Sequence, residues 1–285
     1  MSNQTTLNSE ISYVGVGLHS GVEVHLTLQP AEADTGIVFV RQDLPGTPQV
    51  EARAENVTST LRATTIEANG IKLFTIEHMM SAFNAMKIDN CRVIIDAEEP
   101  PVADGSSQVF CELIKEAGVR ELEAPRREII IDRLYRVDDG DKFILAVPYD
   151  GFRVSFTSIN PHPLIGIQYG DYEISPEEYT REVGKARTIA YEAEVEALRK
   201  MGLGLGGTME NVIVYNDQGW MNELRYPDEL VRHKILDIVG DLRLAGFVRG
   251  HFIAVKSGHA LNTTMAKLLA REFDPTLTGG KSLPS

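Results

Sequence analysis

Each half of this chain is expected to form short strands first and helices afterwards, and this order restricts the fold more than any single motif. The expected strands of the first half are EVHLTLQP (23–30), GIVFVRQD (36–43) and CRVIIDAE (91–98). The first of these alternates apolar and polar residues, as a half-buried strand does. Helices are expected at 75–86, with Thr75 as the N-cap, and at 107–118, closed by Gly118.

The second half repeats this order. Its expected strands are REIIIDRLYRV (127–137), KFILAVPY (142–149), FRVSFTS (152–158), VIVYND (212–217) and the first part of RGHFIAVKSGH (249–259). Its expected helices are SPEEYTREVGKA (175–186), which opens with a serine cap, YEAEVEALRKMG (191–202), PDELVRHKILDIVGDLRLAG (227–246) and TTMAKLLAREF (263–273).

Two α+β layers of sheet on helix follow from this pattern, an arrangement that an old duplication would give. The sequence shows no fixed-period repeat, so the similarity is one of architecture. The charged stretch ELEAPRREI marks the expected boundary near 124–127. We therefore expect one domain at 1–124, a second at 128–275 and a flexible tail at 276–285.

Charge and cysteine content exclude several classes of protein. The chain has 41 acidic against 28 basic residues and a net charge of -13, which argues against non-specific binding to nucleic acid or to an anionic membrane surface. Cys91 and Cys111 have no spacing typical of a metal pair, and free thiols in a reducing compartment are expected. Without a secretory signal pattern or an apolar run of membrane-spanning length, the expected location is the cytoplasm.

The segment VRHKILDIVGD (231–241) carries an unusual row of polar residues on one helical face. His233, Asp237 and Asp241 follow one another at four-residue intervals, so they lie close together on a helix. Two ligands at positions i and i+4 can hold one metal ion, and zinc accepts both imidazole nitrogen and carboxylate oxygen. Taken alone, the His–Asp pair also fits a buried hydrogen bond or a solvated helical pair.

Two other segments complete this candidate site. His78, in TIEHMM, is a third candidate ligand, and the adjacent Glu77 could take a proton from the attacking water, although a glutamate in a first helical turn also suits the helix dipole. His259, in the turn KSGHALN, could supply the acid that a leaving group needs. Asp241 is a natural partner to hold and charge that imidazole.

The glycine-rich segment GLGLGG (202–207) fits the spacing of a dinucleotide fingerprint, but its context does not. That fingerprint needs a strand before it and a helix after it, whereas here a helix precedes and a strand follows. Tight turns and close packing are the expected reasons for these glycines. His19 and His25 are interpreted as structural residues.

With these segments in place, the sequence resembles the UDP-3-O-acyl-N-acetylglucosamine deacetylases, the zinc enzymes of lipid A biosynthesis. The resemblance runs over nearly the whole chain, through GVGLHSG, ARAENVTSTLRATT, TIEHMMSAFNAMKIDN, PPVADGSS, KARTIAY and GLGLGGTMENVIV to the two most specific segments, NELRYPDELVRHKILDIVGDL and GHFIAVKSGHALN. It implies a pair of similar β-α-α-β sandwich domains with the active site between them. It also implies hydrolysis of an N-acetyl group by a cytoplasmic enzyme that acts as a monomer on a UDP-linked, acylated amino sugar.

The resemblance assigns roles to individual residues. The implied zinc ligands are His78, His233 and Asp237, although two histidines and a carboxylate also suit Fe²⁺. Glu77 matches the general base. His259 matches the general acid or electrostatic stabiliser, with Asp241 orienting it, and Lys234 and Thr188 match groups near the developing oxyanion. The residues expected to contact substrate are Lys142 at the nucleotide and Leu18, Ile189, Val195, Gly207 and Thr208 around an apolar passage for the acyl chain.

This chain departs from the family pattern at two places that bear on substrate. Ile189 stands where the family usually has Phe, which affects acyl-chain preference, and Asn160 stands where an aromatic residue often lies beside the nucleotide. Two rival functions follow: a zinc hydrolase acting on a different amide, or a non-catalytic homologue that binds metal or nucleotide. A pure binding protein would need none of Glu77, Asp241 and His259.

Overall fold

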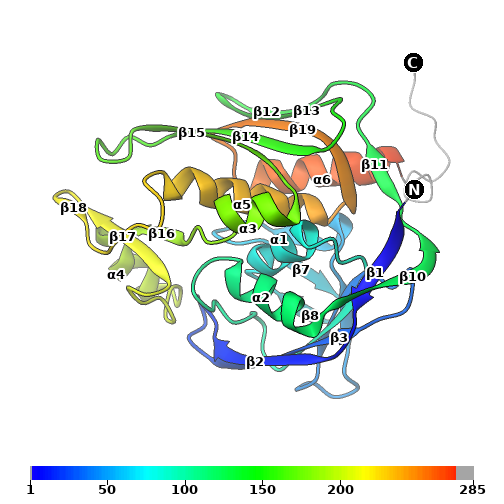
Figure 1. Cartoon of the computed structure of the whole chain (residues 1–285). Coiled ribbons are helices and arrows are strands. Elements are labelled where there is room, and N and C mark those ends of the chain that lie inside the picture. Colours follow the sequence, from blue (N-terminus) through cyan, green and yellow to red (C-terminus); the bar gives the residue numbers. More distant parts are fainter. Residues whose placement is uncertain (1, 274–285) are drawn as a thin grey trace.

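The computed structural model describes residues 2–273, and its two main sheets enclose helices between them (Figure 1). The first sheet has the strand order β2-β3-β9-β4-β5. Its strands are β2 (Ile11–Val16), β3 (Glu23–Pro30), β4 (Ile37–Arg41), β5 (Gln49–Glu51) and β9 (Cys91–Ile95). Two helices of the first half, α1 (Glu77–Ala85) and α2 (Gln108–Ala117), flank β9 in the chain and lie on the inner side of this sheet.

The second sheet has the strand order β12-β13-β19-β14-β15, with β11 added beside β19. Its strands are β11 (Glu128–Ile130), β12 (Tyr135–Asp139), β13 (Lys142–Val147), β14 (Phe152–Ile159), β15 (Ile167–Glu173) and β19 (Phe247–Val255). The helices α5 (Glu229–Arg243) and α6 (His259–Phe273) flank β19 in the chain, as α1 and α2 flank β9.

The two sheets share one topology. In each, the first two neighbouring pairs are antiparallel, the third is parallel and the last is antiparallel. The parallel pair joins β4 to β9 in one half and β14 to β19 in the other. The α+β fold with two similar sheet-and-helix units is therefore confirmed, and the likeness between the halves lies in strand order.

Smaller elements complete each half. In the first half, β1 (Asn3–Leu7) pairs with β10 (Val119–Pro125), and a small sheet of β6 (Val57–Ser59), β7 (Thr65–Ala68) and β8 (Ile71–Leu73) follows the 3-10 turn η1 (Ala54–Asn56). The second half adds the helix α3 (Pro176–Glu182). It also adds a small sheet of β16 (Thr188–Tyr191), β17 (Val212–Asn216) and β18 (Gly219–Trp220), with the helix α4 (Glu192–Lys200) between β16 and β17 in the chain. The group from β16 to β18 projects from the side of the molecule in Figure 1.

The sequence predicted most of these elements but placed some boundaries wrongly. Thr75 is not the cap of α1: its φ of 57° is left-handed, its hydroxyl donates to Glu99, and the helix begins at Glu77. The last helix begins at His259 rather than Thr263. The single strand expected at 127–137 is divided into β11 and β12. The predicted caps Ser175 and Gly118 are confirmed, since Ser175 accepts from Glu178 N and Gly118 has a φ of 72°.

One cluster of buried apolar side chains contains residues from both halves, including Phe83 of α1 and Ile238 of α5. The expected boundary at 124–127 covers the end of β10 and the two residues before β11, and the division into two domains remains a proposal. The tail expected at 276–285 lies outside the described residues. Among residues 2–273, no helix combines the length and the apolar character that a membrane crossing requires.

Candidate active site

The candidate site forms where α1 crosses α5 between the two sheets. The crossing is close because Gly240 has no side chain: a Cβ at this position would overlap the backbone carbonyl of Glu77. Two buried polar side chains of α1 also bind carbonyls of α5, with Ser81 Oγ 2.8 Å from Leu236 O and Asn84 Nδ2 2.7 Å from Val239 O. The first turn of α1 is thereby held against the middle of α5.

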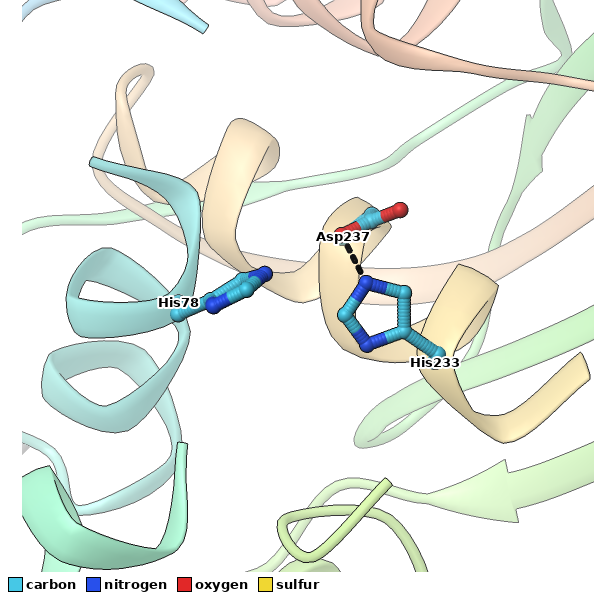
Figure 2. Close-up of side chains that lie close together, drawn as sticks. All are labelled: His78, His233 and Asp237. Atoms are coloured by element: carbon cyan, nitrogen blue, oxygen red, sulfur yellow. Dashed lines mark ion pairs between the residues drawn. The ribbon is translucent and has the colours of Figure 1, made fainter. Parts of the chain in front are cut away.

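Three side chains from these helices converge at the crossing. Figure 2 shows His78 projecting from α1 toward His233 and Asp237 on α5. One ligand atom from each residue lies within 4.8 Å of the others, and all three side chains are buried. The two imidazole rings meet edge to face with centroids 5.0 Å apart. The helix predicted over VRHKILDIVGD and the segment TIEHMM thus supply a three-residue cluster able to hold a metal ion.

The donor set fits zinc in spacing and in chemistry. Ligand atoms about 2.1 Å from a tetrahedral zinc ion lie about 3.4 Å apart. His233 Nε2 lies 3.4 Å from Asp237 Oδ1. Within residues 2–273, the buried Asp237 Oδ1 has no hydrogen-bond partner. Burying an ionised oxygen without a partner costs free energy unless a cation binds it. The second oxygen, Oδ2, accepts from Lys234 Nζ at 2.9 Å.

The surroundings favour the protonation states that metal binding needs. Burial lowers the pKa of His78 to about 3, with His233 adding to the effect, so the His78 imidazole is neutral at neutral pH. Burial also lowers the pKa of His233. Because His233 Nδ1 lies 3.0 Å from Ala186 O, the ring proton is assigned to Nδ1 and the Nε2 lone pair faces the cluster. Burial opposes ionisation of Asp237, but Lys234 and His233 outweigh it and hold its pKa below the usual value.

Glu77 lies at the start of α1, directly before His78. Its side chain is 4% exposed, and Oε2 accepts from Thr64 N at 3.1 Å. Burial raises the pKa of Glu77 to about 7, and the charges of Asp241 and Asp237 add to this rise against the opposing effect of His259. A carboxyl group with such a pKa can accept and release a proton near neutral pH, as a general base must.

His259 and Asp241 form the predicted pair. His259 Nδ1 lies 2.9 Å from Asp241 Oδ2, and His259 Nε2 lies 3.7 Å from Glu77 Oε1. Burial alone would lower the pKa of His259, but Asp241 and Glu77 together raise it to about 10, so the imidazole is a cation at neutral pH. Because His259 begins α6 and Asp241 belongs to α5, the packing of these two helices sets the distance between the two side chains.

Sequence reasoning missed two buried residues that hold Asp241. Thr64 Oγ1 donates to Asp241 Oδ1 at 2.6 Å, and Asn262 Nδ2 donates to Asp241 Oδ2 at 2.9 Å. Thr64 also binds Glu77 through its backbone, so it contacts both carboxylates. Both residues lie inside segments that resemble the family, TSTLRATT and KSGHALN, but nothing in their residue type or spacing indicates these contacts.

A cavity of about 600 Å³ opens onto the cluster and is lined by both halves of the chain. Its described lining includes the predicted catalytic and metal-binding residues Glu77, His78, Thr188, His233, Lys234, Asp237 and His259, together with the predicted substrate residues Leu18, Ile189, Val195, Gly207 and Thr208. Further apolar lining comes from Leu198, Met209, Val212, Val214 and Met221. Lys142, by contrast, lies at the exposed start of β13, outside the described residues that line this cavity, so its contact with the nucleotide remains a prediction.

The glycine-rich segment forms part of the cavity wall by packing against the first half. A Cβ at Gly206 would overlap the carbonyl of Gly17, and Gly206 N donates to Leu18 O at 3.0 Å. Gly202 and Gly204 have φ angles of 73° and 68°. The prediction of tight turns and close packing is confirmed. His19, interpreted as structural, lines the cavity and accepts from Gly204 N through Nδ1 at 3.2 Å.

The substitution Gly240→Ala is expected to weaken metal binding and stability together. Helix propensity alone favours alanine by about 1 kcal/mol, but forcing a methyl group against the Glu77 carbonyl costs about 1–3 kcal/mol and moves His78 away from α5. The measurements are the melting temperature and the zinc Kd. The control is Gly250→Ala, which crowds Ile131 instead. A zinc Kd equal to that of the parent would contradict this account of the crossing.

Comparison with known proteins identifies the family to which the chain is similar. Residues 4–271 match the family LpxC, described as UDP-3-O-acyl N-acetylglycosamine deacetylase. A UDP-3-O-acyl-N-acetylglucosamine deacetylase of Hahella chejuensis is 46% identical over 279 residues, which cover 96% of this chain and 92% of that protein. Proteins of the same name from Anaeromyxobacter dehalogenans and Myxococcus xanthus are 44% and 46% identical over 268 residues, or 93% of this chain and 86% and 85% of theirs.

Proposed function

The chain belongs to the UDP-3-O-acyl N-acetylglycosamine deacetylase family, and from this premise we propose that it hydrolyses the N-acetyl group of UDP-3-O-acyl-N-acetylglucosamine in lipid A biosynthesis. The observation that carries this proposal is the meeting of His78, His233 and Asp237 with Glu77 and the His259–Asp241 pair at one cavity. The reaction consumes water and yields acetate and a free amine. Action in the cytoplasm as a monomer is part of the proposal.

The three clustered residues would hold Zn²⁺ as the resident metal. His78 and His233 would each offer a neutral ring nitrogen and Asp237 a carboxylate oxygen, which leaves a position open as catalytic zinc sites require. When bound, the ion supplies Lewis acidity to the acetamide carbonyl and makes water a nucleophile near neutral pH. The same ligands also suit Fe²⁺, and metal analysis of the enzyme as it is isolated from its own cells distinguishes the two ions.

Glu77 accepts the proton of the attacking water in this mechanism. It lines the cavity beside the ligand cluster, and Thr64 N fixes one of its oxygens at 3.1 Å. As water adds to the acetamide carbon, the carbonyl oxygen gains negative charge. Thr188 and Lys234 line the same cavity, and a positioned donor at such an oxyanion typically contributes about 3–4 kcal/mol. One N–H of Lys234 binds Asp237, which leaves its other two for the substrate.

His259 completes the reaction by giving a proton to the departing nitrogen. Asp241 holds Nδ1, so the proton on Nε2 faces the cavity and Glu77. Transfer of this proton accompanies cleavage of the C–N bond, and acetate and the amine leave. Glu77 then passes the proton that it accepted to His259 or to solvent, and the site returns to its starting protonation state. The two groups therefore divide the roles of base and acid.

The apolar part of the cavity is proposed to take the acyl chain of the substrate. Ile189, Val195 and Met209 lie in its wall, along with the other apolar residues of the segment from β16 to β18. Leu18, Gly207 and Thr208 would contact the substrate where that wall meets the first half of the chain. Lys142 is proposed to meet the nucleotide, although it lies outside the described lining of the cavity. The preferred acyl length depends on Ile189.

Acetate release tests this proposal directly. The UDP-linked, O-acylated amino sugar is incubated with the parent enzyme, with the enzyme stripped by a chelator, and with the stripped enzyme after zinc is added. We expect acetate release to disappear on stripping and to return with zinc. Full activity of a verified metal-free enzyme would refute the metal mechanism. Release from a different acylated amide only would favour the rival hydrolase, and zinc binding with no release from any amide would favour the non-catalytic homologue.

A further inference from the structure

A buried ion pair joins the chain before β16 to the start of α5. Arg187 and Glu229 are 7% and 2% exposed, and Arg187 Nε lies 3.0 Å from Glu229 Oε1. The backbone N–H of Arg187 donates to the same oxygen at 2.9 Å. Glu229 Oε2 accepts from Arg225 N at 2.6 Å and from Arg187 Nη2 at 3.3 Å. One carboxylate therefore receives four hydrogen bonds from two segments.

The residues on either side of Arg187 both reach the proposed active site. Ala186 O accepts the Nδ1 proton of His233 at 3.0 Å, which orients the imidazole so that Nε2 faces the cluster. Thr188 lines the cavity, and its backbone N–H donates to Gly105 O at 2.9 Å. The segment 186–188 thus carries one contact to a candidate metal ligand and one candidate oxyanion donor, with Arg187 between them.

Glu229 is well placed to fix this segment relative to the metal ligands. It begins α5, and His233 follows one helical turn later on the same side of the helix. We infer that the Arg187–Glu229 pair is a positioning device: it holds segment 186–188 against the first turn of α5 and so sets both the orientation of His233 and the place of Thr188. This inference rests on the proposed metal centre.

The chemistry of the pair favours a positioning role over a purely stabilising one. A buried ion pair adds little net stability, because desolvation of both charges offsets most of their attraction. The planar guanidinium, however, has fixed donor directions, so its contacts to both carboxylate oxygens and to Glu223 O at 2.7 Å define the position of the backbone around it. Partners that orient a metal ligand typically contribute about 10–100-fold in metal affinity or activity.

The test uses Glu229→Gln and Arg187→Lys in the full-length enzyme. Glu229→Gln keeps the side-chain shape but removes the charge, and Arg187→Lys keeps the charge but removes the fork of donors. The zinc Kd is measured by competition with a chromophoric chelator, and kcat and KM for acetate release are measured at saturating zinc. We expect each variant to bind zinc about 10–100-fold more weakly and to lose kcat with a smaller change in KM.

The matched control is Asp89→Asn, which weakens a second, partly buried ion pair. The side chains of Arg126 and Asp89 are 7% and 11% exposed, Arg126 Nη2 lies 2.6 Å from Asp89 Oδ2, and neither residue is among the described residues that line the cavity. This control should lower the melting temperature without changing the zinc Kd. If Glu229→Gln and Arg187→Lys also lower only the melting temperature, the pair is merely structural and the inference is wrong.

The two variants and the parent enzyme together distinguish a folding defect, a wrong proposed function and a wrong positioning role. If Glu229→Gln does not fold, Arg187→Lys decides the question, because it retains opposite charges at the buried site. A parent enzyme that neither binds zinc nor releases acetate would contradict the proposed function itself. A parent that does both, together with variants whose zinc Kd and kcat match it, would overturn only the positioning role of Arg187 and Glu229.

Discussion

Replacing Glu77 with glutamine is expected to lower kcat for acetate release by about 10²–10⁴-fold while zinc remains bound. Glutamine has nearly the same shape as glutamate, and its amide oxygen can still accept the hydrogen bond from Thr64 N. It cannot accept a proton from water at neutral pH. Because Glu77 is not one of the three clustered ligand residues, the charge lost in the variant belongs to the base and not to the metal site.

Three measurements separate this expectation from trivial loss of activity. The zinc content and the melting temperature of Glu77→Gln should match those of the parent, and adding zinc should not restore acetate release. A variant that keeps kcat within a few-fold of the parent would show that another group takes the proton. His259 is unsuited to that task, because Asp241, which does most to raise the pKa of its imidazole against the effect of burial, remains in the variant.

The sequence predicted the fold well where the evidence is local. Alternating strands and amphipathic helices depend on periodicity within one segment, so β3, β9, α2 and α5 were expected close to where they lie. Thr75 shows the limit of such reasoning. A threonine before a helical pattern is a good cap by residue type, but here the hydroxyl binds the buried Glu99 and the backbone is left-handed. Tertiary contact outweighed the local preference.

The same distinction applies to the site. The four-residue spacing of His233 and Asp237 placed them together on one helix. The segment TIEHMM offered His78 and Glu77 as a third ligand and a base, roles that the resemblance also implied. The sequence does not show that α1 can approach α5 closely enough for these residues to meet. That depends on Gly240, a helical residue whose importance lies in the carbonyl it touches on another helix. Nor does it show that Thr64 and Asn262 hold Asp241, because both contacts join segments far apart in the chain.

His233→Ala is expected to lower zinc affinity by more than about 100-fold, so that the dialysed variant has no zinc and releases no acetate. Removing a partner that only orients a ligand weakens metal binding by about 10–100-fold. The loss in zinc affinity should be larger here, because the variant keeps just His78 and Asp237 as ligands. The measurements are the zinc content after dialysis and the zinc Kd. His251→Ala is the control, since His251 bonds Ser155 on the second sheet, with 2.6 Å between Nε2 and Oγ, and should retain zinc.

The variants His233→Ala and Glu77→Gln are also expected to differ in how they respond to excess zinc. High zinc should restore part of the acetate release of His233→Ala, because Glu77 and the His259–Asp241 pair remain in place to transfer protons. It should restore none in Glu77→Gln, whose metal site is complete. Zinc content in His233→Ala equal to that of the parent would remove His233 from the ligand set. The orientation of its ring by Ala186, and with it the inferred role of Arg187 and Glu229, would then lose its basis.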